Sequence, residues 1–283
     1  AIQNKIPVLV LDTEMTTEEI TFRMAASQTD IPLWHLETGQ WKNNKEMSSK
    51  MQKFLEQLDS HKYFHYHVRN KGIDEICSII RRWHMKEVGR GNDCIIAYDY
   101  VKLTGEKVSQ NWAEHQAIGD KIDKLKKIAE EIEAPLVTAM QMNRSGESRN
   151  RDSSSLTDDS SAISLSDRLQ WYASFVAIFR RKTIDELALD GQEFGSHKLI
   201  AIKTRFQGRD AAGHNDLIMR QFVEQTDAGA DIVSERLVSN YLSFDISNFK
   251  VKEKGSLEDI IRANNGLIDI SQEDQRQEGS ITF

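Results

Sequence analysis

PVLVLDTEM, at residues 7–15, is a short apolar run that ends in two carboxylates, Asp12 and Glu14. Its length and its β-branched and aliphatic residues predict a strand that is buried on both faces. A second run of this kind, from Cys94 to Tyr98, leads directly into Asp99. Ligand sites in open α/β sheets form at the carboxyl ends of the strands. The two runs together therefore suggest a site for a metal-bound nucleotide.

The segments around these runs alternate between strand and helix patterns. Thr16 and Glu19 have the spacing of a capping box, which predicts a helix that begins here. Apolar stripes at helical spacing follow, and further strand patterns lie between them. This order predicts an α/β fold with a doubly wound, mainly parallel sheet. The helical stripes lie at 47–58, 73–83 and 110–133, and the strand patterns at 62–68 and 136–140.

The later part of the chain has a different pattern. Residues 143–161 are polar, basic at first, and are expected to form a mobile loop. Strands are expected at 175–180 and 198–203. A third strand at 217–222 would pair with 198–203 across a turn at 207–216. From about 248 the apolar pattern fades, so we expect one domain at 1–248 and a polar C-terminal tail at 249–283.

Composition narrows the class of protein. With 283 residues and 39% hydrophobic content, the chain can build a large core. It has neither a signal-peptide pattern nor an apolar run of the ~18 residues that span a membrane. Cys77 and Cys94 lie in apolar contexts and are expected to be free thiols in the reducing cytoplasm. The net charge of −7 argues against a general nucleic-acid coat but permits a local basic path. Ala1 is not an initiator methionine, so we expect a piece of a longer protein.

Each strand-end acid has two interpretations. Asp99 is placed to hold the water shell of Mg²⁺ on a nucleotide, and Glu14 to orient and deprotonate an attacking water. Either residue could instead cap the element that follows it. Asp12 lies on the same face as Glu14 by period-2 alternation, so it competes with Glu14 or shares the site.

Polar residues also follow the later strands. Gln141 comes after the strand at 136–140 and could bond a phosphate or a water. Lys203 and Arg205 end another strand, and two cations at one sheet edge suit an anion. Placed across a subunit boundary, this pair could act as an arginine finger. The plain alternative for each position is a solvated strand end.

The loop after residue 143 carries Arg144, Arg149 and Arg151 among Ser, Asn and Gly residues. This composition suits contact with the phosphates of a single nucleic-acid strand, and an unstructured polar loop is the equal alternative. His65 and His67 share a face of a predicted strand, but no third metal ligand accompanies them.

The order of these motifs resembles that of the C-terminal ATPase domain in DnaB-type replicative helicases, over about residues 7–222. That family places Leu-Glu-Met after an apolar strand, then a helix that continues into an arginine, here Arg23. Its metal-binding Walker B strand usually reads Asp-Tyr-Leu-Gln-Leu. The segments that carry the resemblance are LDTEMTTEE at 11–19, IIAYDYVKL at 95–103, LKKIAEEIEAPLV at 125–137, QMNR at 141–144 and KTRFQG at 203–208.

The resemblance implies a RecA-like P-loop NTPase fold with antiparallel strands toward the C-terminal part. It implies a cytoplasmic phage or bacterial motor that binds ATP and Mg²⁺, forms a homo-hexameric ring on single-stranded DNA, and works with a primase or loader. Glu14 would be the general base and Asp99 the Mg²⁺ carboxylate. Gln141 would sense the phosphate. The remaining implied roles are nucleotide binding for Arg23, reach into the neighbouring subunit's site for Lys203 and Arg205, and DNA contact for Arg144, Arg149 and Arg151.

One family motif is missing. The phosphate-loop signature Gly-x-x-x-x-Gly-Lys-Ser/Thr does not occur, and we expect it upstream of Ala1. Without that cradle the chain alone should not hydrolyse ATP. Alternative readings are a RecA-like recombinase, a packaging ATPase, or a non-catalytic loader or scaffold with a degenerate ATPase fold.

Overall fold

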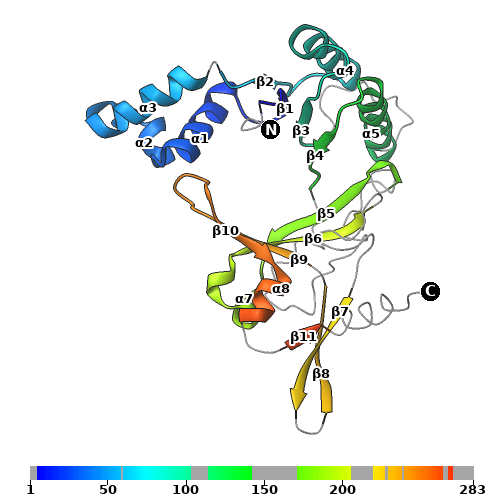
Figure 1. Cartoon of the computed structure of the whole chain (residues 1–283). Coiled ribbons are helices and arrows are strands. Elements are labelled where there is room, and N and C mark those ends of the chain that lie inside the picture. The colour runs from blue at the N-terminus through cyan, green and yellow to red at the C-terminus, as the bar shows by residue number, and fades with distance from the viewer. Residues whose placement is uncertain are drawn as a thin grey trace, which may run out of the picture. The chain divides into compact units, whose positions relative to one another are not determined.

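A computed structural model of the chain shows two compact units (Figure 1). The first unit extends from the N-terminal strand through β4 and also holds residues 246–250, and the second contains the strands from β5 onward. The structure describes residues 5–58, 60–102, 114–141, 171–204, 219–226, 229–237, 239–263 and 267–269.

A parallel four-stranded sheet organises the first unit, in the order β2-β1-β3-β4. Its strands are β1 (Val8–Asp12), β2 (Tyr63–His67), β3 (Ile95–Asp99) and β4 (Leu136–Thr138). β1 pairs with β2 on one side and β3 on the other, all in parallel. All four strands coincide with expected ones, which confirms the parallel α/β class.

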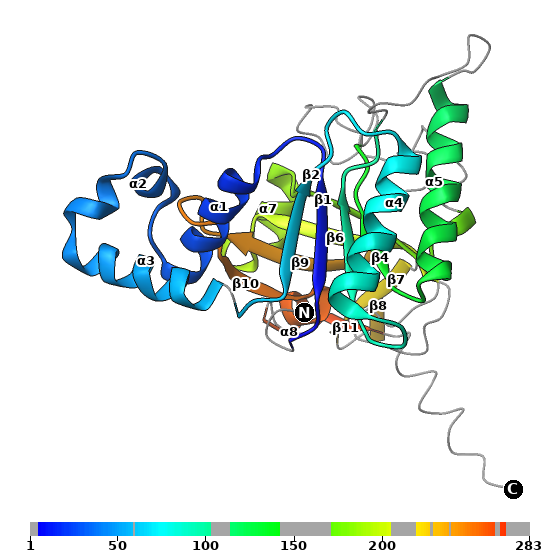
Figure 2. The same cartoon turned by 90° about the horizontal axis from the view of Figure 1, so that it is seen from above.

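Two amphipathic helices pack together on one face of this sheet, as Figure 2 shows. They are α4 (Ile73–Trp83), which continues into the π-helical turn η3 (His84–Val88), and α5 (Glu114–Glu131). Every apolar position of the stripe expected on α4 is buried. The alternation along each strand places one set of side chains in this core, including Leu9, Leu11, Ile96 and Tyr98.

A separate helical cluster follows β1. It contains α1 (Thr17–Thr29), α2 (Leu33–Glu37), the 3₁₀ turn η2 (Gln40–Asn43) and α3 (Lys45–Leu58). The capping box of Thr16 and Glu19 is present at the start of α1, as the sequence predicts. Residues 246–250 belong to this unit, where Ser247 accepts a bond from the Leu33 N–H at 2.8 Å and Lys250 pairs with Asp30.

Antiparallel sheets form the second unit, as expected for the later part of the chain. One has the order β10-β9-β6-β5 and the other β11-β7-β8. The elements are β5 (Phe175–Arg181), α7 (Ile184–Asp190), η6 (Gln192–Phe194), β6 (His197–Thr204), β7 (Met219–Thr226), β8 (Gly229–Leu237), β9 (Ser239–Phe244), β10 (Val251–Ser256), α8 (Leu257–Ala263) and β11 (Leu267–Asp269).

The pairing expected for the strand at 217–222 is wrong. β7 pairs with β8 and β11, while β6 lies between β5 and β9. Only two residues separate β7 from β8, so this hairpin closes at a lower entropic cost than the 14-residue connection back to β6.

Part of the expected polar tail has regular structure. Residues 251–263 form β10 and α8, and Leu257 and Ile260 of α8 are buried. Two buried positions among those described are too few to register as a helical stripe in the sequence. The domain division at residue 248 stays a prediction.

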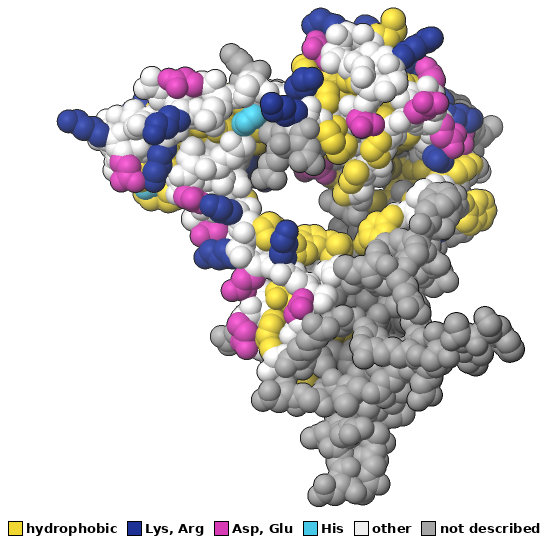
Figure 3. Space-filling model, viewed as in Figure 1, with side chains coloured by type: hydrophobic (Ala, Val, Ile, Leu, Met, Phe, Trp, Pro, Cys, Tyr) yellow, Lys and Arg dark blue, Asp and Glu magenta, His cyan; other side chains and the backbone are white. Residues whose placement is uncertain are grey.

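The visible surface carries both signs of charge. Figure 3 shows basic and acidic side chains interspersed over the helices of the first unit, without a single-sign field on this face of the described residues. Among the described helices, none has the length and apolar character needed to cross a membrane.

Candidate functional site

Three strands of the parallel sheet end at one edge. Asp12, the last residue of β1, stands directly opposite Asp99, the last residue of β3. Glu14 follows β1 by two residues, and Gln141 follows β4, the other neighbour of β3. Parallel strands bring their carboxyl ends to the same edge, so the fold places the acids, and the end of the strand that Gln141 follows, at one edge of the sheet.

The loop that carries Glu14 is fixed by hydrogen bonds from both neighbouring strands. The Asp12 carboxylate accepts from the backbone N–H groups of Glu14 and Met15, each at 2.7 Å. The Thr13 N–H donates to the Asp99 carbonyl at 2.8 Å. On the other side, His67 Nδ1 lies 2.8 Å from the Met15 carbonyl, and it must donate because a carbonyl only accepts. The backbone around Glu14 is therefore held in one conformation.

His65 of β2 and Asp12 of β1 lie close together beside this loop. His65 Nε2 lies 3.9 Å from an Asp12 oxygen, and both side chains are almost fully buried. Burial lowers the pKa of His65, and the nearby Asp12 carboxylate opposes this effect without cancelling it. His65 also bonds the Thr17 hydroxyl at 2.9 Å, which connects β2 to the start of α1. The sequence expectation that His65 and His67 share a face is confirmed by their register opposite Val10 and Asp12.

The Glu14 carboxylate is exposed and points toward the segment after β3. Its Oε1 atom accepts from Lys102 Nζ at 2.7 Å and from the Tyr100 hydroxyl at 3.2 Å. The bond and the charge of Lys102 are the main reasons why the pKa of Glu14 is lowered. Sequence reasoning missed Lys102. The available signal was its place, three residues beyond Asp99, where the resembling family usually has Gln.

Asp99 has the opposite electrostatic environment. Partial burial raises its pKa, and the charges of Asp12 and Glu14 raise it further. A divalent cation here would relieve this repulsion. The carboxylates that raise the Asp99 pKa, those of Asp12 and Glu14, are oxygen donors. Oxygen donors are what Mg²⁺ prefers, so the residues fit this ion.

No group of three or more His, Cys, Asp or Glu side chains within the described ranges forms a ready-made metal cluster. Mg²⁺ on a nucleotide is typically held by one or two carboxylates, waters and phosphates rather than by a protein cage. The arrangement around Asp99 suits that mode of binding.

Of the remaining expected site residues, Arg23 and Lys203 lie on other elements, and four arginines lie outside the described ranges. Arg23 is exposed on α1, with its guanidinium 5.0 Å from the Phe249 ring centroid. Lys203 is half-buried on β6, opposite Val176. Gln141 is exposed just beyond β4. Outside the described residues lie Arg144, Arg149, Arg151 and Arg205.

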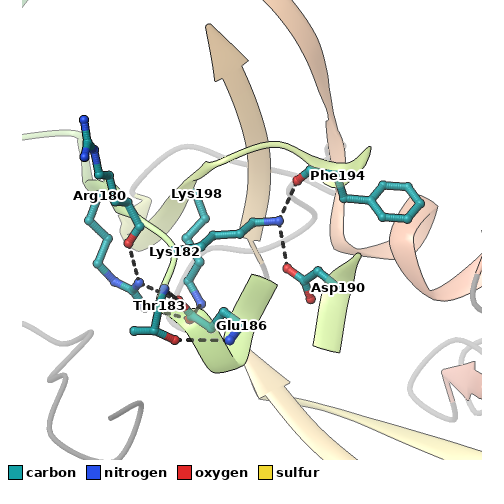
Figure 4. A network of polar contacts seen from close by, with 8 residues as sticks. Arg180, Lys182, Thr183, Glu186, Asp190, Phe194 and Lys198 are labelled. Atoms are coloured by element: carbon teal, nitrogen blue, oxygen red, sulfur yellow. Dashed lines mark hydrogen bonds and ion pairs between the residues drawn. The ribbon is translucent and has the colours of Figure 1, made fainter. Parts of the chain in front are cut away.

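A network of polar contacts includes the start of β6, the strand that carries Lys203 (Figure 4). Arg180 donates two bonds to the Glu186 carboxylate, at 2.7 and 2.8 Å, and Lys198 of β6 also pairs with it. Burial alone would raise the pKa of Glu186, but these cations outweigh it and hold the pKa far below its usual value. Beside it, Lys182 and Asp190 form a buried ion pair at 2.8 Å.

Residues 1–212 match a family model described as the DnaB-like helicase C terminal domain. A "Probable replicative DNA helicase" of Trieres chinensis is 24% identical over 208 residues, which is 70% of this chain and 45% of that protein. The "Replicative DNA helicase DnaB" of Helicobacter pylori is 30% identical over 159 residues, or 53% of this chain and 30% of that protein. The chain thus spans less than half the length of these curated relatives.

Solved structures share the fold. A structure described as a DnaB-like replicative helicase and its interactions with primase superposes with a TM-score of 0.65 at 17% identity, covering 88% of this chain and 51% of that chain. A second, described as an ATPase domain, has a TM-score of 0.65 at 18% identity and covers 88% of this chain and 75% of that chain.

Proposed function

Because the chain belongs to the family of DnaB-like helicase C-terminal domains, we propose that it forms the catalytic part of an ATP-driven replicative DNA helicase. The observation that carries this proposal is the register of the parallel sheet, which places Asp99 opposite Asp12 and beside the anchored Glu14 loop. The family match favours a helicase over a recombinase, a packaging ATPase or a non-catalytic scaffold.

Glu14 is the proposed general base. Its carboxylate is exposed and held on a fixed loop, and like any exposed glutamate it is ionised at neutral pH. From this position it can take a proton from the water whose oxygen bonds the γ-phosphorus, while the bond from that phosphorus to the ADP oxygen breaks. Bound Mg²⁺ would neutralise the charge that develops on the phosphate oxygens, and Asp99 would hold this ion through its water shell.

Gln141 is the proposed phosphate sensor, because it lies exposed at the end of the strand next to Asp99. We assign Lys203 and Arg205 to the nucleotide of the neighbouring subunit, since an arginine fork suits phosphate and stabilises transition-state charge. Arg23 is assigned to nucleotide binding on the family resemblance, although its guanidinium lies over Phe249. A homo-hexameric ring would bring these groups together between subunits.

Single-stranded DNA is the proposed track. Arg144, Arg149 and Arg151 would contact its phosphates in the ring's central channel, a salt-sensitive and sequence-independent interaction. A primase or loader is a proposed partner, since one of the matching solved structures is described together with its primase interactions.

The full activity needs more than this chain. The phosphate-loop signature does not occur in the 283 residues. Backbone N–H groups of that loop normally cradle the β- and γ-phosphates. We expect no ATP turnover by the chain alone.

The test uses the full-length protein, with ATP hydrolysis measured with and without single-stranded DNA and unwinding measured on a forked duplex. Wild type should hydrolyse ATP faster with DNA and separate the fork. Glu14→Gln should reduce turnover by about 10²–10³-fold, because the base is lost, while nucleotide still binds.

Glu18→Gln is the matched control, since Glu18 is an exposed acid in the first turn of α1. It should keep wild-type turnover. Hydrolysis by Glu14→Gln at the wild-type rate would remove Glu14 as the base. A wild-type protein without any ATPase activity would instead favour the non-catalytic scaffold.

A further inference from the structure

The two bonds to the Glu14 side chain converge on one oxygen. Lys102 Nζ and the Tyr100 hydroxyl both donate to Oε1. The other oxygen, Oε2, accepts no bond from the described residues. A carboxylate held in this way is fixed in rotation and keeps one oxygen open, which is the geometry that a base needs to receive a proton from water.

Lys102 reaches Glu14 from a rigid backbone. The Lys102 carbonyl accepts a bond at 2.7 Å from Lys121, a fully buried lysine on α5. The neighbouring Val101 is buried, and its N–H donates to the Ala139 carbonyl at 2.9 Å. The Lys102 ammonium also lies 4.6 Å from the Tyr100 ring centroid, within reach of a cation–π contact. These contacts restrict the backbone of Val101 and Lys102, from which the Lys102 side chain extends.

We propose that Lys102, assisted by Tyr100, is a positioning residue that orients Glu14 by fixing Oε1 and leaving Oε2 toward the attacking water. This inference rests on the proposed role of Glu14 as the base. Lys102 does not touch the reacting atoms and acts only through Glu14. Small errors in the placement of a reacting group can cost up to about 10²-fold in rate, so the effect of losing this restraint should be measurable.

The contact between Lys102 and Glu14 should contribute little to the stability of the fold. Side-chain exposure is 57% for Glu14 and 29% for Lys102, and exposed ion pairs contribute little to folding. Removing the Lys102 ammonium should therefore leave the fold intact. Its effect on the rate of hydrolysis can then be separated from any effect on stability.

The test compares Lys102→Met with Lys102→Gln in the full-length protein. Methionine keeps a long unbranched side chain but has neither donor nor charge, whereas glutamine retains an N–H donor. Lys102→Met should lower kcat for ATP hydrolysis about 10–30-fold with KM changed less than about 2-fold. Lys102→Gln should return kcat to within about 3-fold of wild type, because its donor can restore the bond to Oε1.

Two further variants sharpen the result. Lys71→Met removes a half-exposed lysine that pairs with Glu75, four residues along the chain, and should leave kcat unchanged. In a Glu14→Gln background, Lys102→Met should have no additional effect, because a residue that acts only through Glu14 has nothing left to orient.

Several outcomes would overturn the inference. One is wild-type kcat in Lys102→Met. Another is equal impairment of the methionine and glutamine variants, which would implicate charge rather than orientation. A raised KM with unchanged kcat would make Lys102 a nucleotide contact, and additive effects with Glu14→Gln would show that it acts elsewhere. If wild type itself lacks ATPase activity, the proposed function fails first, and this inference falls with it.

Discussion

At the scale of single residues, the three acids at the carboxyl edge of the parallel sheet differ in their burial and in the groups that they contact. Asp12 is buried, and one of its oxygens accepts two backbone N–H bonds. Asp99, directly opposite, has a raised pKa because it is partly buried beside the charges of Asp12 and Glu14. Glu14 is exposed and oriented by side chains. We therefore propose that Asp12 anchors the loop, which leaves Glu14 as the acid that acts on the water.

This division predicts how two substitutions of Asp12 will differ. Asp12→Asn keeps an oxygen that can accept from the N–H groups of Glu14 and Met15, so ATP turnover should stay within about 3-fold of wild type. Asp12→Ala leaves both N–H groups without that acceptor, which costs about 1–3 kcal/mol for a buried group, and turnover should fall at least about 10-fold. Steady-state hydrolysis by the full-length protein measures both.

The reverse order of activities, with the asparagine variant the weaker one, would show that the Asp12 charge matters more than its acceptor. Equal and unimpaired activity of both variants would show that the loop does not depend on Asp12.

The sequence predicts the positions of residues whose signal is local. Glu14 and Asp99 were singled out because each follows an apolar run, and both runs are strands in the structure. The contacts of Lys102 with Glu14 and of His67 with Met15 were not predicted, because they join segments that are distant in the sequence. Such contacts depend on the pairing register, which a single sequence does not specify.

At the scale of elements, the same contrast between local and distant information recurs. The capping box of α1 and the apolar stripe of α4 depend on residues within two or three turns, and both were predicted correctly. The partner of β7 depends on which hairpin closes first, and that prediction was wrong. Helix α8 was missed because its buried face contains only Leu257 and Ile260 among its described positions.

The Glu186 network gives a prediction about the stability of the β5–α7–β6 region. Glu186→Gln removes the charged carboxylate that Arg180 and Lys198 share at a partly buried site, and breaking such a pair costs about 3 kcal/mol. Amide hydrogen exchange in β5, α7 and β6 should therefore become about 10²-fold faster at neutral pH. Glu253→Gln, which changes an exposed acid on β10 of the same unit, is the control and should leave exchange unchanged.

This prediction also has a pH dependence. The folded-state pKa of Glu186 lies below the unfolded value of ~4.3, so the folded state binds fewer protons. Its stabilising contribution is complete above the unfolded pKa and is lost as pH falls through the folded pKa. The gap in protection factor between wild type and Glu186→Gln should therefore narrow below about pH 4. A gap that widens on acidification would contradict the assignment.

At the scale of the whole molecule, the chain carries only part of the proposed site. The base and the metal carboxylate lie in the first unit, and Lys203 lies in the second. The phosphate-loop signature does not occur in the sequence of either unit. A ring in which one subunit completes the site of the next would explain why Lys203 and Arg205 are separated in sequence from the acids.

Mixing two inactive variants tests completion between subunits. Glu14→Gln removes the base, and Arg205→Ala removes the proposed finger from the neighbour. In rings assembled from equal amounts of the two, up to about one quarter of the interfaces join an intact base to an intact finger. ATP hydrolysis should therefore reappear on mixing.

Each variant alone, taken through the same disassembly and reassembly, is the control. Mixed rings as inactive as either variant alone would place Glu14 and Arg205 in the same subunit's site.

The central claim is that the carboxyl edge of the parallel sheet is where ATP is hydrolysed. Its most direct test is a cryo-electron microscopy map of the full-length protein with Mg²⁺ and a non-hydrolysable ATP analogue. The account predicts Asp99 in the water shell of Mg²⁺ and Glu14 Oε2 within about 3–3.5 Å of a water in line with the γ-phosphate. Nucleotide bound away from this edge, with Glu14 and Asp99 facing only solvent, would contradict it.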